Sequence, residues 1–344
     1  MKHLLISIVA ILLCCTTLSA QQTKRQLIKK LNSVYELLEQ YYVEDVPLEP
    51  LVEEAIRATF RSLDPHTQYY TREEMKALKC HLNGENTTLH PIEAFRVDNV
   101  GYIKISTFTK PIASEFYTAY RELGNVTSIV IDLRDNGGGY VTGAIDLTSL
   151  FLSKGDVIMT RVSKQREMVF DTKRDGILKD IPLVVIINEN TASASETFAG
   201  AIQDHDRGVI VGHTSFGKGL IQKIIENKDG SGVLITTAYD KTPSGRTIQR
   251  PYTKGQGDAY RSDSARYAHP DTMHRAESLK FKTLKRGRTV YANGGITPDV
   301  YIDTNAAAPS AVTQYTDIDK SDYMAQRAIA IAKSSEEIAS ILEK

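Results

Sequence analysis

The chain has 344 residues, with 42 basic and 42 acidic side chains and a pI near 7.1. This length is enough for one large domain or two modest ones, each with a substantial core. Because the charge is balanced, nothing in the composition indicates nucleic acid or an anionic membrane surface as a partner.

The first twenty residues are predicted to be a secretory signal peptide. Lys2 and His3 precede an apolar run over residues 4–13, and small polar residues follow as far as Ala20. The run is too short to cross a bilayer comfortably, and no later segment approaches about 20 continuous apolar residues. We therefore expect an exported protein, periplasmic or extracellular and envelope-associated, with no stable membrane anchor after cleavage.

Two of the three cysteines, Cys14 and Cys15, fall in this segment. Leu13 rather than a small residue precedes Cys14, which argues against a lipid anchor at either cysteine. Cleavage would leave Cys80 alone, so the mature protein has no intramolecular disulfide and depends on its core for stability.

The region 21–80 is predicted to be helical. Apolar residues recur at helical spacing over 24–42 and again over 50–62. Pro65 ends this pattern, because proline prevents the helix from continuing and restricts the residue before it. Residues 81–99 are polar and rich in turn formers, and we interpret them as a linker.

From Gly101 onward, short apolar runs alternate with helical patterns, which is typical of an α/β domain. We place this core at 100–305, followed by a C-terminal segment over 306–344 with a terminal helix. Helices are predicted over 111–123, 141–152 and 194–204. Strands are predicted over 101–106, 128–133, 183–187, 208–212, 219–226 and 232–239, the last two joined by a turn at 229–232.

A serine and a lysine near the middle of the chain suggest a nucleophile and its base. Ser193 lies between a buried strand and a helix, so its hydroxyl would sit at a helix N-terminus, where backbone amides face developing negative charge. The Ala194 amide is then a natural donor to an oxyanion. The alternative is that Ser193 is only a helix cap, a common role for serine.

Lys218 can accept a proton only if burial keeps its amine neutral. Gly217 and Gly219 flank it and would let backbone close over the side chain. On a straight strand, Lys218 and Gln222 would lie about 13 Å apart, so the chain must bend near Gly219 if Gln222 is to orient the amine. Taken alone, Lys218 would be interpreted as a solvated surface charge.

A glycine-rich segment, Asp132-Leu133-Arg134-Asp135-Asn136-Gly137-Gly138-Gly139, follows a hydrophobic strand and precedes a helix. Its glycines can bring bare backbone close to a ligand and supply a second oxyanion donor. The alternative is a flexible turn. Phosphate binding is disfavoured because no Gly-Lys-Ser/Thr sequence completes a P-loop.

In these residues the chain resembles the carboxy-terminal processing peptidases, the S41 family of serine endopeptidases. The similarity extends over nearly all of the mature sequence, in stretches of matching order and spacing. They are Ser62 to Thr67, Gly101 to Ile105, Asp132 to Gly139, Thr191 to Glu196 with Gln203-Asp204, Thr214 to Gln222, Thr242 to Ile248 and Gly294 to Asp299.

The resemblance implies a role for each candidate residue. Ser193 would be the nucleophile, Lys218 the general base and Gln222 the residue that positions the lysine. Ala194 and Gly138 would supply the oxyanion amides, with Gly137 or Gly139 as alternatives to the glycine, and Asp204 would be a structural acid. The family core is a spiral ββα arrangement like those of crotonase and ClpP, and it requires neither cofactor nor metal.

The chain departs from the family in one respect. Members usually carry a PDZ domain of about 80–90 residues before the Gly101 strand, whereas about thirty residues separate Tyr70 from Gly101 here. We therefore expect no PDZ domain, which puts recognition of substrate C-termini in doubt.

The favoured hypothesis is an exported serine endopeptidase that forms an acyl-enzyme with protein or peptide substrates. A homo-oligomer through the N-terminal helices is a further expectation. One alternative is a catalytically silent binding or scaffold protein on the same fold. A thioester-binding, crotonase-like enzyme is disfavoured because the Ser/Lys pair is more specific than the fold.

Overall fold

The structure is a computed structural model that describes residues 23–83, 91–262, 276–303 and 322–344. The chain divides into two compact units, residues 1–59 and residues 60–344. The predicted signal peptide, with Cys14 and Cys15, lies outside the described residues.

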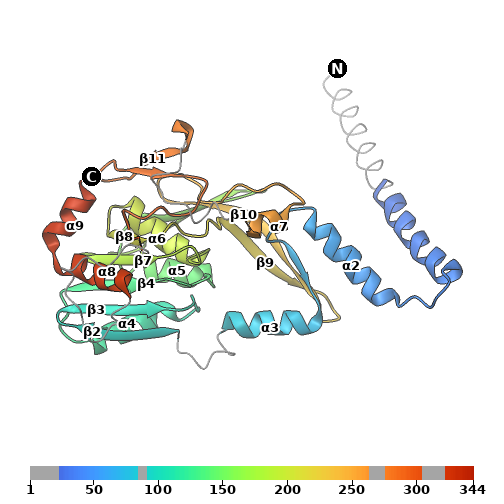
Figure 1. The fold of residues 1–344 in the computed structure, drawn as a ribbon, viewed down its shortest axis with the longest axis horizontal. Coiled ribbons are helices and arrows are strands. Elements are labelled where there is room, and N and C mark those ends of the chain that lie inside the picture. The colour runs from blue at the N-terminus through green and yellow to red at the C-terminus, as the bar shows by residue number, and fades with distance from the viewer. Residues whose placement is uncertain (1–22, 84–90, 263–275, 304–321) are drawn as a thin grey trace, which may run out of the picture. The chain divides into compact units, whose positions relative to one another are not determined.

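The first unit is helical where it is described, which confirms the prediction of a helical N-terminal region (Figure 1). Residues 23–41 form one helix, and α2 (Leu48–Arg61) begins in this unit. Many apolar side chains of the first helix are exposed, with Leu27 at 63%, Leu31 at 51% and Leu37 at 55%. No helix in the described part of the chain is long and apolar enough to cross a membrane.

A six-stranded sheet forms the centre of the second unit, in the order β13-β8-β7-β4-β3-β2. Its pairs are parallel except for β2 with β3. The central strands are buried on both faces and contain continuous runs of Val, Ile and Leu, as expected for a covered parallel sheet. The strands are β2 (Ile92–Val97), β3 (Val100–Ile105), β4 (Ser128–Asp132), β7 (Leu183–Ile187), β8 (Val209–Gly212) and β13 (Val300–Tyr301).

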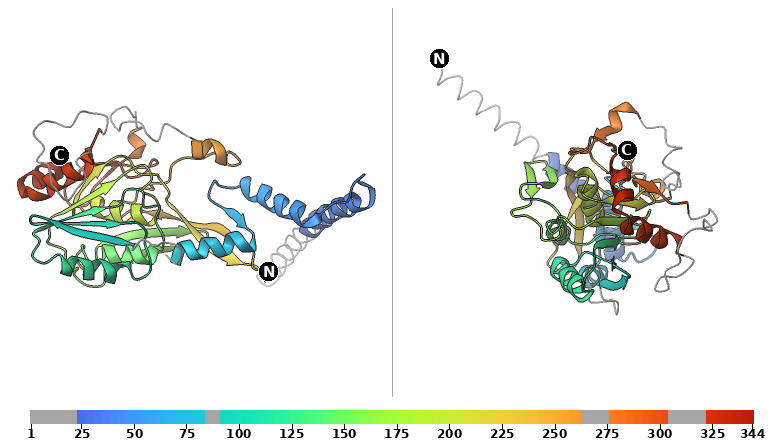
Figure 2. Two further views of the ribbon diagram at one scale, coloured as in Figure 1. Left: turned by 60° about the horizontal axis from the view of Figure 1, so that its bottom comes forward. Right: turned by 90° about the vertical axis from the view of Figure 1, so that its left-hand side faces the viewer.

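Helices cover both faces of this sheet, and the alternation of side chains along β7 shows how. Val185 and Ile187 pack in one cluster with α4 (Ile112–Glu122), α5 (Val141–Thr148) and α6 (Ala194–Asp204). Val184 and Ile186 point the other way, into a second cluster with α8 (Tyr323–Lys333) and α9 (Ser335–Leu342). Figure 1 labels these helices, and Figure 2 shows the unit from two other directions.

An antiparallel sheet adjoins this core and carries part of the candidate site. Its order is β1-β10-β5-β6, with β9 also paired to β10. The strands are β1 (Gln68–Tyr70), β5 (Val157–Ser163), β6 (Glu167–Asp171), β9 (Leu220–Glu226) and β10 (Gly232–Lys241). The remaining elements are α3 (Arg72–Asn83), α7 (Gly257–Ser262), the 3-10 helix η3 (Glu277–Leu279) and the hairpin of β11 (Lys280–Lys282) and β12 (Thr289–Tyr291).

The α/β fold class predicted from the sequence is confirmed, whereas some segments differ. The segment predicted as a linker over 81–99 contains β2, which pairs antiparallel with β3. This strand was not predicted because few of its residues face the core. Only Ile92, Phe95 and Val97 are partly or fully buried in it. The predicted helix over 141–152 ends at Thr148. The strands β5 and β6 were not predicted, because charged and polar residues interrupt them.

Candidate active site

Ser193 lies at the N-terminal end of α6, after β7 and a short connecting loop. Its φ of 58° is in the left-handed region, which a residue other than glycine adopts at an energetic cost. The surrounding contacts hold this conformation. Ala192 donates its N–H to the carbonyl of Asn136 at 3.0 Å, and the Ser195 hydroxyl donates to the same oxygen at 3.1 Å.

The first turn of α6 has one backbone N–H, that of Ala194, which makes no hydrogen bond within the helix. The N–H groups of Ser195 and Glu196 donate to Ala192 and Ser193 carbonyls. Ala194 is the first helical residue, and its N–H has no backbone acceptor among the residues that the structure describes. This amide is therefore at the position where a helix N-terminus stabilises an anion.

A single buried carboxylate joins the Ser193 loop to the Lys218 loop. Glu196 is fully buried, and its Oε2 accepts the N–H of Ser193 at 2.9 Å and the N–H of Lys218 at 2.8 Å. Its Oε1 accepts the N–H of Gly217 at 2.7 Å and the hydroxyl of Ser215 at 2.5 Å. Four donors from two loops thus converge on one side chain, and two of them belong to the proposed nucleophile and base.

The side chain of Lys218 lines the same cleft as Ser193. Burial lowers the pKa of Lys218, while the charges of Glu196 and Asp64 act in the opposite direction. No carboxylate in the described residues forms an ion pair with its amine. Burial and then the Lys218 amine lower the pKa of His66 to about 4, so His66 is neutral at physiological pH. The arrangement favours a neutral lysine, the form that can accept a proton.

Gln222 lies in β9, opposite Thr236 of β10. Its side-chain amide donates to the carbonyl of His66 at 2.6 Å, which leaves its Oε1 to accept from an amine. Only Gly219 separates Lys218 from this strand, and the positive φ, 84°, is at Gly217, on the other side of Lys218. The prediction that Gln222 orients Lys218 stays a prediction, because the hydrogen bond shown is to His66.

The glycine-rich loop packs directly against the nucleophile. Gly138 has a φ of 105°, and a Cβ placed there would lie 2.8 Å from Cβ of Ser193 and 3.0 Å from the Ala194 nitrogen. Only glycine fits this position. The Gly138 N–H, however, donates to Oδ1 of Asn136 at 2.9 Å, so this amide already has an acceptor. Asn136 is itself held by a hydrogen bond to the Ile105 carbonyl at 2.8 Å.

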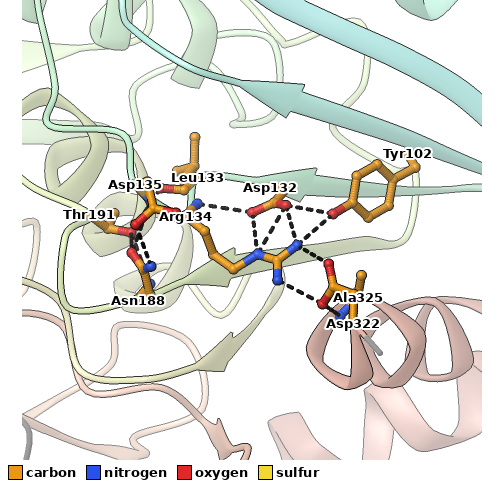
Figure 3. A network of polar contacts seen from close by, with 9 residues as sticks. All are labelled: Tyr102, Asp132, Leu133, Arg134, Asp135, Asn188, Thr191, Asp322 and Ala325. Atoms are coloured by element: carbon orange, nitrogen blue, oxygen red, sulfur yellow. Dashed lines mark hydrogen bonds and ion pairs between the residues drawn. The ribbon is translucent and has the colours of Figure 1, made fainter. Parts of the chain in front are cut away.

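Arg134 ties the base of this loop to the C-terminal helices (Figure 3). Its guanidinium contacts the buried carboxylate of Asp132 at 2.6 Å and that of Asp322 at 2.7 Å. Tyr102 donates to Asp132 at 2.6 Å from the neighbouring strand. Asp322 also caps α8 by accepting the Ala325 N–H at 3.0 Å. This network is buried at Tyr102 and Asp132 and partly exposed at Arg134 and Asp322, and it fixes the start of the glycine loop relative to α8.

A second set of contacts in Figure 3 joins the glycine loop to the loop before Ser193. Asp135 accepts a hydrogen bond from the side-chain amide of Asn188 at 2.9 Å and, from a residue that Figure 3 does not draw, another from that of Asn190 at 2.8 Å. The Thr191 hydroxyl donates to the carbonyl of Leu133 at 2.8 Å. The two loops that carry Ser193 and Gly138 therefore form one hydrogen-bonded unit.

Asp204 lies at the far end of α6 from Ser193, with its side chain fully buried against that of Arg246 at 2.8 Å. It also accepts the N–H of Ser244 at 3.0 Å. These contacts are structural. In the described residues, no group of three or more His, Cys, Asp or Glu side chains is placed to hold a metal ion.

Comparison with known proteins identifies part of the chain. Residues 99–256 match the model of a family described as peptidase family S41. This segment is a peptidase family S41 domain. It contains Ser193, Lys218 and Gln222 together with the glycine loop, and it includes the parallel sheet from β3 to β8.

Several relatives of this S41 domain are known. The chain is 39% identical over 163 residues to a carboxy-terminal-processing protease of Bartonella bacilliformis, covering 45% of this chain and 38% of that protein. It is 38% identical over 154 residues to a carboxyl-terminal-processing protease of Synechocystis, covering 44% of this chain and 36% of that one. The chain thus spans little more than a third of the length of these curated relatives.

A solved structure, a photosystem II D1 C-terminal processing protease, aligns with 73% of this chain and 54% of its own, at a TM-score of 0.48 and 25% identity.

The sequence predicted the three candidate catalytic residues from their motifs. It did not predict the bridging role of Glu196, although the residue stands three positions after Ser193, the spacing at which a glutamate commonly returns to a helix cap.

Proposed function

We propose that this chain is an exported serine endopeptidase that hydrolyses peptide bonds of protein substrates through a Ser/Lys mechanism. One observation carries the proposal. Ser193 and a buried Lys218 line the same cleft, and the backbone amides of both residues bind the same carboxylate of Glu196. The match of residues 99–256 to peptidase family S41 supports it.

The first half of the proposed reaction forms an acyl-enzyme. The Ser193 oxygen attacks the substrate carbonyl carbon while its proton passes to the neutral amine of Lys218. The carbonyl oxygen becomes an oxyanion, which the Ala194 N–H stabilises at the open end of α6. The C–N bond then breaks, and Lys218 returns its proton to the leaving amine.

The second half hydrolyses this ester. Lys218, neutral again, accepts a proton from a water molecule as the water attacks the acyl carbon, and Ser193 regains its proton when the C–O bond breaks. A second oxyanion donor would come from the glycine loop. The position of Gly138 beside Ser193 supports this role, in which its amide would exchange its hydrogen bond with Asn136 for one with substrate.

Two further parts of the proposal concern the whole protein. We propose export on the basis of residues 1–20, which lie outside the described structure. We also propose that the exposed apolar side chains of the helix over 23–41 pair with a second copy of the chain. Sedimentation of the chain with and without residues 21–45 tests this pairing. If the full chain sediments as a monomer, as the shortened chain does, the pairing is contradicted.

Labelling with a fluorophosphonate probe tests the enzymatic proposal. We expect wild-type protein to be labelled at Ser193 by peptide mapping, and Ser193→Ala and Lys218→Ala to lose both label and peptide cleavage. Lys241 lines the same cleft and provides a matched control, so Lys241→Ala should keep the label. A folded wild-type protein that neither reacts nor cleaves would favour the silent binding protein instead.

A further inference from the structure

The cleft beside Ser193 has mainly apolar walls. Residues of β5 and β9 and one residue of the segment after β10 line it, namely Ile158, Met159, Leu220, Ile221 and Ile248. Its free volume is about 20 Å³, close to the space that one water molecule occupies. A substrate side chain that enters it must therefore be small.

One carboxyl group interrupts these apolar walls. Asp240 of β10 also lines the cleft and is only 8% exposed. Its Oδ1 has one long contact, 3.4 Å, with Nε of Arg161 on the neighbouring strand β5. Its Oδ2 is buried and has no hydrogen-bond partner within the described parts of the chain. A buried acceptor left without a donor is costly, and such groups are uncommon in folded proteins.

The two threonine hydroxyls of the cleft have partners already. The Thr197 hydroxyl donates to the carbonyl of Ser193 at 3.4 Å, and the Thr242 hydroxyl lies 3.2 Å from that of Ser244. Oδ2 of Asp240 is thus the acceptor that a bound group would satisfy. Burial raises the pKa of Asp240 to about 7, against the opposing effect of Arg161, so the carboxylate predominates at mildly alkaline pH.

We propose, building on the peptidase function above, that Asp240 determines specificity by selecting a small side chain with a hydroxyl group, serine or threonine, at the substrate residue whose carbonyl is attacked. The hydroxyl donates to Oδ2, and its one or two carbons contact the apolar walls. Lysine or arginine is disfavoured, because each is too long and because Arg161 and Lys241 place positive charge beside the same cleft.

Isosteric pairs of peptides test the proposal at pH 8.5. Two pairs of otherwise identical peptides carry threonine or valine, and serine or 2-aminobutyrate, at this position. We expect wild-type kcat/KM to favour the hydroxyl member about tenfold in both pairs, as a hydrogen bond to a buried charged acceptor would give. Asp240→Leu should abolish or reverse the preference, whereas the matched variant Thr242→Val should keep it.

The possible results distinguish a failure of the role proposed for Asp240 from a failure of the proposed peptidase function. Cleavage of both members of each pair at equal rates by wild type overturns the role of Asp240 even if Asp240→Leu does not fold. A hydroxyl preference that persists in folded Asp240→Leu overturns it as well. Labelling of Ser193 by the serine probe is independent of this preference, so a chain that neither cleaves nor reacts loses the peptidase function together with this inference.

Discussion

Replacing Glu196 with glutamine should damage both the stability of the fold and the chemistry of the base. Four donors and no acceptor face the Glu196 carboxyl group, from Ser193, Ser215, Gly217 and Lys218. Glutamine keeps the shape but presents one oxygen and one –NH2 group. With the –NH2 group in place of Oε2, the N–H groups of Ser193 and Lys218 face another donor. With it in place of Oε1, the N–H of Gly217 does so, while the Ser215 hydroxyl can turn to accept.

The cost follows from the backbone N–H groups that lose their acceptor. A buried donor without an acceptor costs about 1–3 kcal/mol and one or two donors are affected, so we expect Glu196→Gln to lower the free energy of unfolding by about 1–6 kcal/mol. This is a large part of the roughly 5–15 kcal/mol that holds a typical domain folded. Urea denaturation measures it, with Glu122→Gln on the exposed surface of α4 as the matched control.

The pH dependence separates this electrostatic role from a purely structural one. The negative charge of Glu196 raises the pKa of Lys218 against the effect of burial. Its removal should lower that pKa further, so the rise of kcat/KM with pH should move to lower pH in Glu196→Gln. A variant with wild-type stability and a wild-type pH midpoint would refute the bridging role of the carboxylate.

Three further predictions concern the base, the glycine loop and the substrate. Burial lowers the pKa of Lys218, so between this lowered pKa and about 10.5 the unfolded chain holds a proton on Lys218 that the native protein has lost. The free energy of unfolding should therefore rise with pH over that range. Lys218→Met should be inactive, should melt at a higher temperature than wild type at pH 7 and should not show this pH dependence of stability. A lower melting temperature than wild type would contradict the reasoning. Gly138→Ala, whose Cβ would lie 2.8 Å from that of Ser193, should lose kcat by about a hundredfold or more, whereas Gly137→Ala, with open space around its Cβ, should not; equal losses in both would count against a specific role for Gly138. Finally, if no PDZ domain reads the substrate terminus, amidating the C-terminus of an unfolded peptide should change kcat/KM less than about tenfold, and a larger loss would show that this chain recognises a free carboxylate.

Several features of this protein follow from the sequence by itself. Continuous Val and Ile runs indicated the buried parallel strands β4, β7 and β8, because side chains covered on both faces leave no polar alternation. The order and spacing of the motifs around Ser193 and Lys218 indicated the peptidase family. These are local signals, carried by a few neighbouring residues.

The tertiary structure alone decided how those motifs meet. Glu196 joins residues up to 22 positions away, Arg134 reaches Asp322 across 188 positions, and Gln222 reaches His66 across 156. From the neighbouring sequence alone, Glu196, Arg134 and Gln222 could each be an ordinary polar residue of the surface or of a helix cap. The pairing of β10 with β5 similarly places Asp240 beside Arg161. Contacts of this kind depend on long-range packing, which fixes both the partner of a polar group and its burial, and neither is encoded in the spacing of nearby residues.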